Sequence, residues 1–394
     1  MKLSPNIETV QFPPITEVKS WLVGLEPRAD RPLVDLCQAV PDYAPAPELV
    51  DHLRSLLDDP MTSRYSPDEG LPEVRTAVSA WIGRRYGAAP TAEEICLTIG
   101  ASQAFWLAIM TVCKSGDEVI VQLPAYFDHP MALQALGIRC VWVPFAEANA
   151  NAGQPDVAGI AARITPRTRA ILLVSPSNPT GAVTPPETLL QIYRLAKQHD
   201  IALILDETYN AFIPAGTSPH ALFAEPHWQQ HFIQIASFGK TFALTGYRAG
   251  ALVAGPEVIY QALKVQDAMV VCQARITQQA ILYGCTHLDG WVAANAVIMQ
   301  RRHDRFQTLF SQPGNPFRLV ASGSFFAWVK HPWPRLSGRE AARRLVEDAR
   351  LLCLPGEAFG PGLAGYLRLA FGNIQEDDVP AAVQRLIESE TSDE

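Results

Sequence analysis

The apolar run Phe232-Ile233-Gln234-Ile235-Ala236 leads directly into Ser237-Phe238-Gly239-Lys240-Thr241, and Gly246-Tyr247-Arg248-Ala249-Gly250 follows within ten residues. The run predicts a buried strand with a lysine at its mouth, between a hydroxyl and a guanidinium. Burial removes water from an ammonium group and lowers its pKa, and Schiff-base chemistry requires a neutral amine. The hydroxyl and the guanidinium suit an anion such as a phosphate ester. An isolated lysine is more often a surface residue. Whether Lys240 is a functional residue therefore depends on the other residues that accompany it along the chain.

Apolar strands alternate with helices through the middle of the chain. The predicted strands are 94–98, 117–121, 139–143, 169–174, 201–205, 232–236 and 249–254, and the predicted helices are 101–114, 127–136, 157–164 and 186–199. This pattern predicts the α/β class, with a mostly parallel, doubly wound sheet covered on both faces. Ligands bind beyond the carboxyl ends of such strands. Five residues follow strand ends and should gather there: Gly100, Tyr126, Asn178, Asp206 and Lys240.

The alternation ends near residue 285. Helices over 288–310 and 338–349 and strands over 325–329 and 366–371 indicate a smaller α+β domain. We therefore predict a large domain over 41–285 and a small domain over 286–394. Segment 1–40 should join them, because its short elements offer no core of their own.

Composition narrows the class of protein. A chain of 394 residues suits two domains, and 48% hydrophobic residues allow a large core. The net charge of −8 argues against nucleic acid as a main partner. The sequence contains neither a signal-peptide-like start nor an apolar window long enough for a membrane span. Seven cysteines without a CxxC pair indicate small core residues in a reducing compartment, so we expect a cytoplasmic protein with no metal site.

The spacing of serine, lysine and arginine resembles a known motif. Serine three residues before Lys240 and arginine eight after it resemble the pyridoxal-phosphate lysine motif of the class I/II aminotransferases, which have fold type I and belong to the aspartate aminotransferase superfamily. The resemblance extends from about Leu33 to Phe371. It implies that the large domain binds pyridoxal 5′-phosphate through a Schiff base on Lys240. An amino group would then pass from an L-amino acid to a 2-oxo acid.

The resemblance also implies a phosphate site. Gly100-Ala101-Ser102-Gln103 lies between a strand and a helix, where free backbone amides attract an anion. Ala101 and Ser102 would bind the cofactor phosphate together with Ser237 and Arg248. An ordinary helix cap by Ser102 is the alternative.

Asp206-Glu207-Thr208-Tyr209 carries two further implied roles. Asp206 would keep the pyridine nitrogen protonated, which makes the ring an electron sink, and Tyr209 would reach the phenolic oxygen O3′. A lone aspartate after a strand is otherwise a turn or cap residue. Tyr126 would stack on the ring. His129 either supports Asp206 from behind or is a buried histidine with a routine hydrogen bond.

The substrate carboxylate has three implied neighbours. Asn178, in Ser175-Pro176-Ser177-Asn178-Pro179-Thr180-Gly181, would lie near this carboxylate and O3′. Arg368 would hold the carboxylate bidentately, although a strand arginine is otherwise usually a solvated edge residue. Ala39 stands where many members have a glycine before Pro-Asp, so it would crowd the backbone beside the carboxylate.

Tyr65, in Ser63-Arg64-Tyr65-Ser66-Pro67-Asp68-Glu69-Gly70, resembles the tyrosine that crosses to a partner's phosphate. It implies a homodimer with shared active sites.

The donor is expected to be neutral, aromatic or long-chain rather than aspartate. Ser102 occupies a position where some aspartate-specific members have a lysine. Four side chains leave apolar surface near the first helix and the N-terminal arm: Phe12, Ile15, Trp21 and Trp106. The alternative is that these are core residues.

Other functions remain open at this stage. A C–S lyase or another fold-type I enzyme would use the same cofactor residues, because the reaction depends on which Cα bond stands perpendicular to the ring. A ligand-sensing regulator with this fold would need a DNA-binding domain, and the roughly 30 residues before Leu33 are too few and not basic. A nicotinamide-binding protein is disfavoured because no G-x-G-x-x-G follows the first strands.

Overall fold

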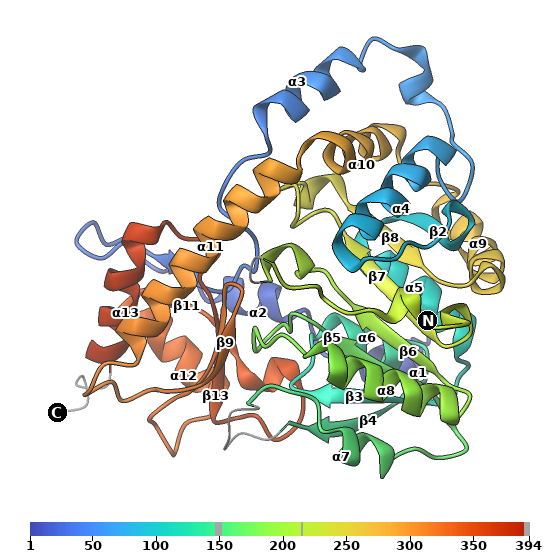
Figure 1. Ribbon diagram of the computed structural model, residues 1–394. Helices are drawn as coiled ribbons and strands as arrows, with labels where there is room; N and C mark the ends of the chain where they lie inside the picture. The colour runs from blue at the N-terminus through green and yellow to red at the C-terminus, as the bar shows by residue number, and fades with distance from the viewer. Residues whose placement is uncertain (146–151, 214–215, 390–394) are drawn as a thin grey trace.

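A seven-stranded sheet forms the larger part of the molecule, on the right of Figure 1. The computed structural model describes residues 1–145, 152–213 and 216–389. The strand order is β2-β8-β7-β6-β5-β3-β4. The strands are β2 (Ile95–Ile99), β3 (Glu118–Leu123), β4 (Arg139–Pro144), β5 (Thr168–Val174), β6 (Ala202–Asp206), β7 (Phe232–Ser237) and β8 (Ala249–Val253). This confirms the predicted α/β class.

Most neighbouring strands in this sheet are parallel. The pairs from β7 through β6, β5 and β3 to β4 are all parallel. β8 is antiparallel to both β7 and β2, because the connection over residues 238–248 is too short for a crossover to a parallel strand. β2 consequently points in the same direction as β7. The carboxyl ends of all strands except β8 therefore lie at one edge.

Helices cover both faces of the sheet, as the alternation in sequence predicts. One face carries α5 (Gly100–Val112), α6 (Asp128–Ala135) and α9 (Pro256–Val270); the other carries α4 (Pro72–Tyr86), α7 (Val157–Ala161), α8 (Pro186–Gln198) and α10 (Arg275–His287). Side chains of β5 alternate between them. Ala170 and Leu172 join one hydrophobic cluster, and Ile171 and Leu173 join the other.

An antiparallel sheet of order β12-β13-β10-β9 forms the smaller part, on the left of Figure 1. Its strands are β9 (Arg318–Gly323), β10 (Phe326–Lys330), β12 (Leu354–Pro355) and β13 (Tyr366–Ala370), and its helices are α11 (Asp289–Phe310), α12 (Gly338–Arg344) and α13 (Val379–Glu388). The helix predicted over 338–349 changes at Leu345 into a π-helical turn, Leu345–Ala349. Residues 390–394 of the predicted small domain lie outside the described residues.

The N-terminal segment touches both parts. Its elements are α1 (Pro5–Glu8), α2 (Pro14–Ser20) and β1 (Val34–Asp35), and α3 (Pro47–Ser55) follows. β1 pairs in parallel with β11 (Leu351–Leu352), α2 packs on β12, and α1 packs on α6. The domain limits at 41–285 and 286–394 stay a prediction.

Glu118 is a buried carboxylate at the start of β3. Arg139 and Arg167 donate to its Oε1, the latter at 2.6 Å, and the hydroxyl of Thr165 donates to its Oε2 at 2.8 Å. The hydrogen bond from Arg139 is the largest cause that lowers the pKa of Glu118, to about 2, against the opposing effect of burial. The carboxylate thereby ties β4 and the loop before β5 to β3.

We expect Glu118→Gln to lower the free energy of unfolding by about 1–3 kcal/mol at pH 7, because three donors lose a charged acceptor. The folded pKa is depressed, so this contribution is present above the unfolded pKa of about 4.3 and is lost as the pH falls towards about 2. Denaturant titrations from pH 7 to pH 3 should show a shrinking difference from the wild type. Asp377→Asn, at a side chain that is 97% exposed, is the control. A difference independent of pH would contradict this account.

Candidate active site

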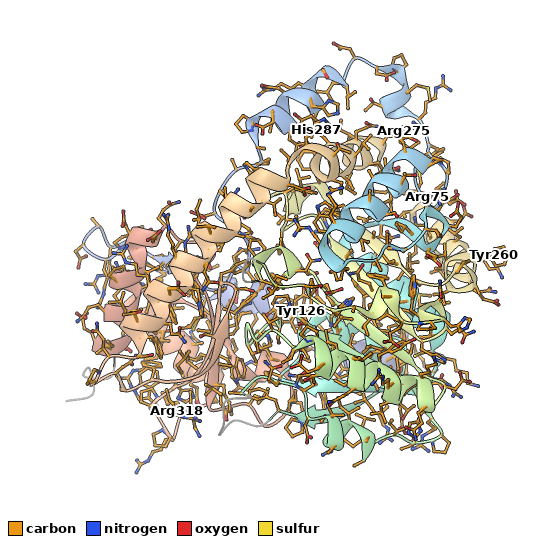
Figure 2. All side chains as sticks on the ribbon, viewed as in Figure 1. Arg75, Tyr126, Tyr260, Arg275, His287 and Arg318 are labelled. Atoms are coloured by element: carbon orange, nitrogen blue, oxygen red, sulfur yellow. The ribbon has the colours of Figure 1, made fainter. Side chains whose placement is uncertain are left out.

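A cavity of about 110 Å³ lies at the carboxyl edge of the seven-stranded sheet. Every sequence-predicted cofactor residue except Tyr65 contributes to its wall: Ala101, Ser102, Tyr126, Asn178, Asp206, Tyr209, Ser237, Lys240 and Arg248. Figure 2 labels Tyr126 near the centre of the molecule, where the two parts meet. The chain thus brings together side chains that are up to 147 residues apart, from Ala101 to Arg248.

The first turn of α5 and Arg248 form a positive end of the cavity. Gly100 adopts φ +74°, and a Cβ there would lie 2.7 Å from the Arg248 guanidinium, so this guanidinium lies directly against the turn. Its Nη1 donates to the carbonyl of Thr245 at 3.1 Å. A Cβ at Gly250 would lie 2.4 Å from Gly100 C, so β8 approaches the turn closely. Free amides and a guanidinium in one place suit a phosphate.

The amine of Lys240 has a strongly lowered pKa. Burial is the largest cause and the like charge of Arg248 is the second, and together they bring the pKa to about 8. The carboxylates of Asp206 and Asp128 oppose this shift. A substantial fraction of neutral amine is therefore present near neutral pH, as nucleophilic attack on an aldehyde requires.

Asp206 ends β6 in a buried position. Its Oδ2 lies 3.1 Å from Nε2 of His129, and its Oδ1 accepts from the backbone amide of Thr208 at 2.9 Å. The ring of Phe105 packs on His129, with the ring centroids 4.2 Å apart. His129 therefore lies in direct contact with Asp206, and its supporting role stays a prediction.

Asp128 is a cavity residue that sequence analysis missed. It begins α6, and its Oδ2 accepts a hydrogen bond of 2.5 Å from the hydroxyl of Tyr126. The Tyr126 ring stands edge-on to His129, with the centroids 5.3 Å apart. An aspartate in the first turn of a helix is common because the helix dipole stabilises it, so its position carries no signal of a functional role.

Arg368 connects the smaller sheet to the cavity wall. This side chain on β13 is only 1% exposed, and its Nη1 donates to Oδ1 of Asn178 at 3.2 Å. Its Nη2 donates to the backbone carbonyl of Cys37, while Nε has no hydrogen-bond partner in the described part of the chain. Burial lowers the pKa of Arg368 and raises that of the neighbouring Tyr209.

The backbone next to Arg368 differs from the expectation. Ala39, predicted to crowd the carboxylate site, packs partly buried against the hydrophobic core. The carbonyl that contacts Arg368 belongs to Cys37, two residues earlier. A backbone carbonyl carries no side-chain signal, so only the fold could reveal it.

Tyr65 lies outside the cavity. Its side chain is 78% exposed in the loop between η1 (Pro60–Ser63) and α4. Its backbone carbonyl accepts a hydrogen bond of 3.0 Å from Arg275 on α10, which Figure 2 labels. Within one chain, Tyr65 therefore contributes nothing to the site.

The apolar residues expected near the substrate are also dispersed. Trp106 on α5 lines the cavity. Ile15 and Trp21 pack against a hydrophobic cluster that includes Phe127 of the larger part and Trp328 of the smaller part, and Tyr126 packs against the same cluster. Phe12 is 66% exposed. The expectation that these side chains leave apolar surface for the donor stays a prediction.

A family model described as "Aminotransferase class I and II" matches residues 31–386. The chain belongs to this family. The aromatic aminotransferase ISS1 of Arabidopsis thaliana is 28% identical over 98% of this chain and 95% of its own. A probable aspartate/prephenate aminotransferase of Thermus aquaticus is 31% identical and covers 91% of each chain. A solved mutant of Thermus thermophilus aspartate aminotransferase superposes with a TM-score of 0.89 at 28% identity, over 99% of this chain and 100% of that chain.

The cavity of this aminotransferase fits the family's cofactor, pyridoxal phosphate. The fit rests on a glycine turn against Arg248 for the phosphate, a buried carboxylate at Asp206 for the ring nitrogen, and an amine of lowered pKa at Lys240. The described residues contain no His, Cys, Asp and Glu group suited to a metal ion. Among these same residues, no helix is both long and apolar enough to cross a membrane.

We expect the Lys240 amine of the cofactor-free protein to titrate near pH 8 rather than near 10.5. Arg248→Gln should move this midpoint up, because it removes a repelling cation, and Asp206→Asn should move it down, because it removes an attracting anion. The rate of modification of Lys240 by trinitrobenzenesulfonate, followed by mass spectrometry across pH, measures the midpoint. Arg169→Gln, outside the cavity, is the control. An unchanged midpoint in Arg248→Gln would show that the guanidinium does not act on the amine.

Proposed function

We propose that this aminotransferase is a cytoplasmic homodimer that carries its cofactor on Lys240 and acts on a neutral, aromatic or long-chain L-amino acid. The observation that carries the cofactor assignment is the meeting of Lys240, Asp206 and Arg248 in one cavity. The seven cysteines are all free thiols, which supports a reducing compartment.

The proposed roles of the cofactor residues follow from their chemistry. When bound, pyridoxal phosphate supplies an aldehyde and an electron-withdrawing ring. The amides of Ala101 and Ser102 bind the phosphate together with the Ser237 hydroxyl and the Arg248 guanidinium. Tyr126 covers one face of the ring.

The remaining residues hold or move protons. Asp206 keeps a proton on the ring nitrogen, and His129 holds the carboxylate in place through its 3.1 Å contact. Tyr209 and Asn178, which line the same cavity, would interact with O3′. The Lys240 amine moves the substrate's Cα proton as general base and then general acid, a task that suits a pKa of about 8.

Arg368 binds the substrate α-carboxylate in this proposal. Its guanidinium is already oriented by Asn178 and by the Cys37 carbonyl, and its Nε, which has no hydrogen-bond partner among the described residues, is available to donate. Ala39 shapes the backbone of this subsite indirectly, because it lies two residues after Cys37. A carboxylate held by arginine is not the group that leaves, so loss of the Cα proton is favoured over decarboxylation.

Reduction of the holoenzyme with borohydride should fix the cofactor to Lys240, because that amine forms the Schiff base. Digestion and mass spectrometry should find the adduct on this peptide. Lys240→Ala should lose the adduct and all turnover. Lys264→Ala, which changes an exposed side chain on α9, should lose neither. An adduct on another lysine would refute the assignment.

The same holoenzyme tests the reaction class. Single amino acids should shift its absorbance in a half-reaction and release a 2-oxo acid, and a second 2-oxo acid should reverse the shift. Sustained release of ammonia with pyruvate, and without a 2-oxo acid acceptor, would identify a C–S lyase instead. Aspartate, phenylalanine, leucine and glutamine form the donor series.

The exposed side chain of Tyr65 supports a dimer. Leu57 and Met61, in the segment just before Tyr65, are also exposed, and exposed apolar groups can mark interaction sites. In the dimer, Tyr65 would reach the phosphate of the partner's site, so each site would need both chains.

We expect Tyr65→Phe and Lys240→Ala chains, each impaired alone, to complement each other after subunit exchange. A heterodimer would carry both defects in one site and leave the other intact, giving about half of the wild-type activity. Differently tagged chains verify the exchange, and light scattering measures the oligomeric state. A verified heterodimer no more active than the Tyr65→Phe parent would place Tyr65 in its own chain's site.

A further inference from the structure

Asp128 is a partly buried residue of the cavity wall. It lines the same cavity as Lys240, and its hydrogen bond to the Tyr126 hydroxyl fixes its position. Its negative charge favours the protonated form of both Lys240 and Tyr209, and for Lys240 it opposes the overall lowering of the pKa. Its field therefore reaches both of these side chains. Nothing in the cofactor chemistry described above uses this carboxylate.

The cations around the cavity all have other assignments. Arg248 faces the phosphate turn, Lys240 carries the cofactor, and Arg368 is held beside Asn178 for the α-carboxylate. Among the described residues that line the cavity, the ionisable side chain without an assignment is therefore the acid Asp128. A second carboxylate on a donor would meet a negative charge and no unassigned cation among the described residues that line the cavity.

Aromatic residues form a further part of the cavity wall. Phe105, Trp106 and Tyr126 line the same cavity. Aromatic rings favour apolar and aromatic groups, and they do not compensate a carboxylate. The charge of Asp128 and the aromatic side chains thus both disfavour a donor with a second carboxylate.

We propose that Asp128 determines donor specificity by disfavouring amino acids that carry a second carboxylate and leaving uncharged, aromatic side chains favoured. This inference rests on the proposed function, because it concerns the substrate of the same site. Like charges in a partly dehydrated site repel strongly enough to change an affinity about tenfold. Asp128 acts on selection, whereas Lys240 and Asp206 act on the reaction.

The alternative is that Asp128 only stabilises the start of α6. A carboxylate in the first turn interacts favourably with the helix dipole. Its loss would then weaken the fold or displace Tyr126, and every ligand would respond alike. The two roles therefore differ in whether the effect depends on the charge of the ligand.

Binding of two unreactive acids to the holoenzyme separates these roles. Succinate has a second carboxylate, and 3-phenylpropanoate has an aromatic ring in its place, while both retain one carboxylate for Arg368. Kd values come from calorimetric titration of the wild type, Asp128→Asn and Asp377→Asn. The last variant removes the same charge at an exposed site on the smaller part, which controls for the net charge of the protein.

We expect the wild type to prefer 3-phenylpropanoate, and Asp128→Asn to bind succinate about tenfold more tightly while 3-phenylpropanoate changes less than twofold. Asp377→Asn should leave both Kd values unchanged. Equal changes for both ligands in Asp128→Asn, or a wild type that prefers succinate, would overturn the proposal. Asp128→Ser provides the same comparison should the amide variant not fold.

Failure of the proposed function has a different signature. A wild-type holoenzyme whose absorbance responds to no amino acid would refute the aminotransferase reaction, and the two Kd values would still decide the role of Asp128. Tyr126→Phe removes the hydrogen bond and retains the carboxylate, so it should preserve discrimination against succinate. Loss of discrimination in Tyr126→Phe would show that the tyrosine hydroxyl, and not the charge, selects the ligand.

Discussion

Burial of one amine among charged groups is the constraint on which the site depends. A buried ammonium is costly, so Lys240 lies where its charge can be given up and recovered. Burial and Arg248 favour the neutral form, and Asp206 and Asp128 favour the charged form. Such a balance requires these groups to lie close together around one cavity, where Asp206 is buried, Lys240 and Asp128 are partly buried and Arg248 is exposed. The parallel sheet provides this, because the ends of its buried strands meet at one edge.

The two parts of the chain are joined at the site itself. Arg368 on the smaller sheet contacts Asn178 on a turn of the larger part. The same turn contains Gly181, where a Cβ would lie 2.3 Å from the backbone nitrogen of Gly323 on β9. Two backbones in such contact leave no room for a side chain on either. The position of Arg368 is therefore coupled to the turn that carries Asn178, through a hydrogen bond and a direct backbone contact.

The strands of the large sheet were predicted from the sequence more completely than the helices that cover it. Buried strands such as β5 and β7 are continuous apolar runs, so their limits were visible to within a residue or two. α4, α9 and α10 were not predicted. α4 ends in Arg84 and Arg85 beside buried Trp81, and α10 mixes polar and apolar residues on several sides, which blurs their periodicity. The direction of β8 depended on the length of a loop rather than on any residue pattern.

Some residues of the site could also be predicted from the sequence, whereas others became visible only in the folded structure. Side chains of unusual chemistry directly after strands, such as Asp206 and Lys240, were visible in the sequence. The Cys37 carbonyl could not be predicted, because every residue has a backbone carbonyl and the residue type does not indicate its role. Asp128 could not be predicted, because an acidic residue at the start of a helix is common. Relatives named for aromatic amino acids and for aspartate have comparable identity to this chain. Since the cofactor requires the same contacts for either donor, the choice of donor depends on residues that can change without disturbing those contacts. In this cavity, Ser102 and Asp128 are such positions: in the proposed site the phosphate would bind the backbone amide of Ser102 and not its side chain, and none of the proposed cofactor roles uses the Asp128 carboxylate.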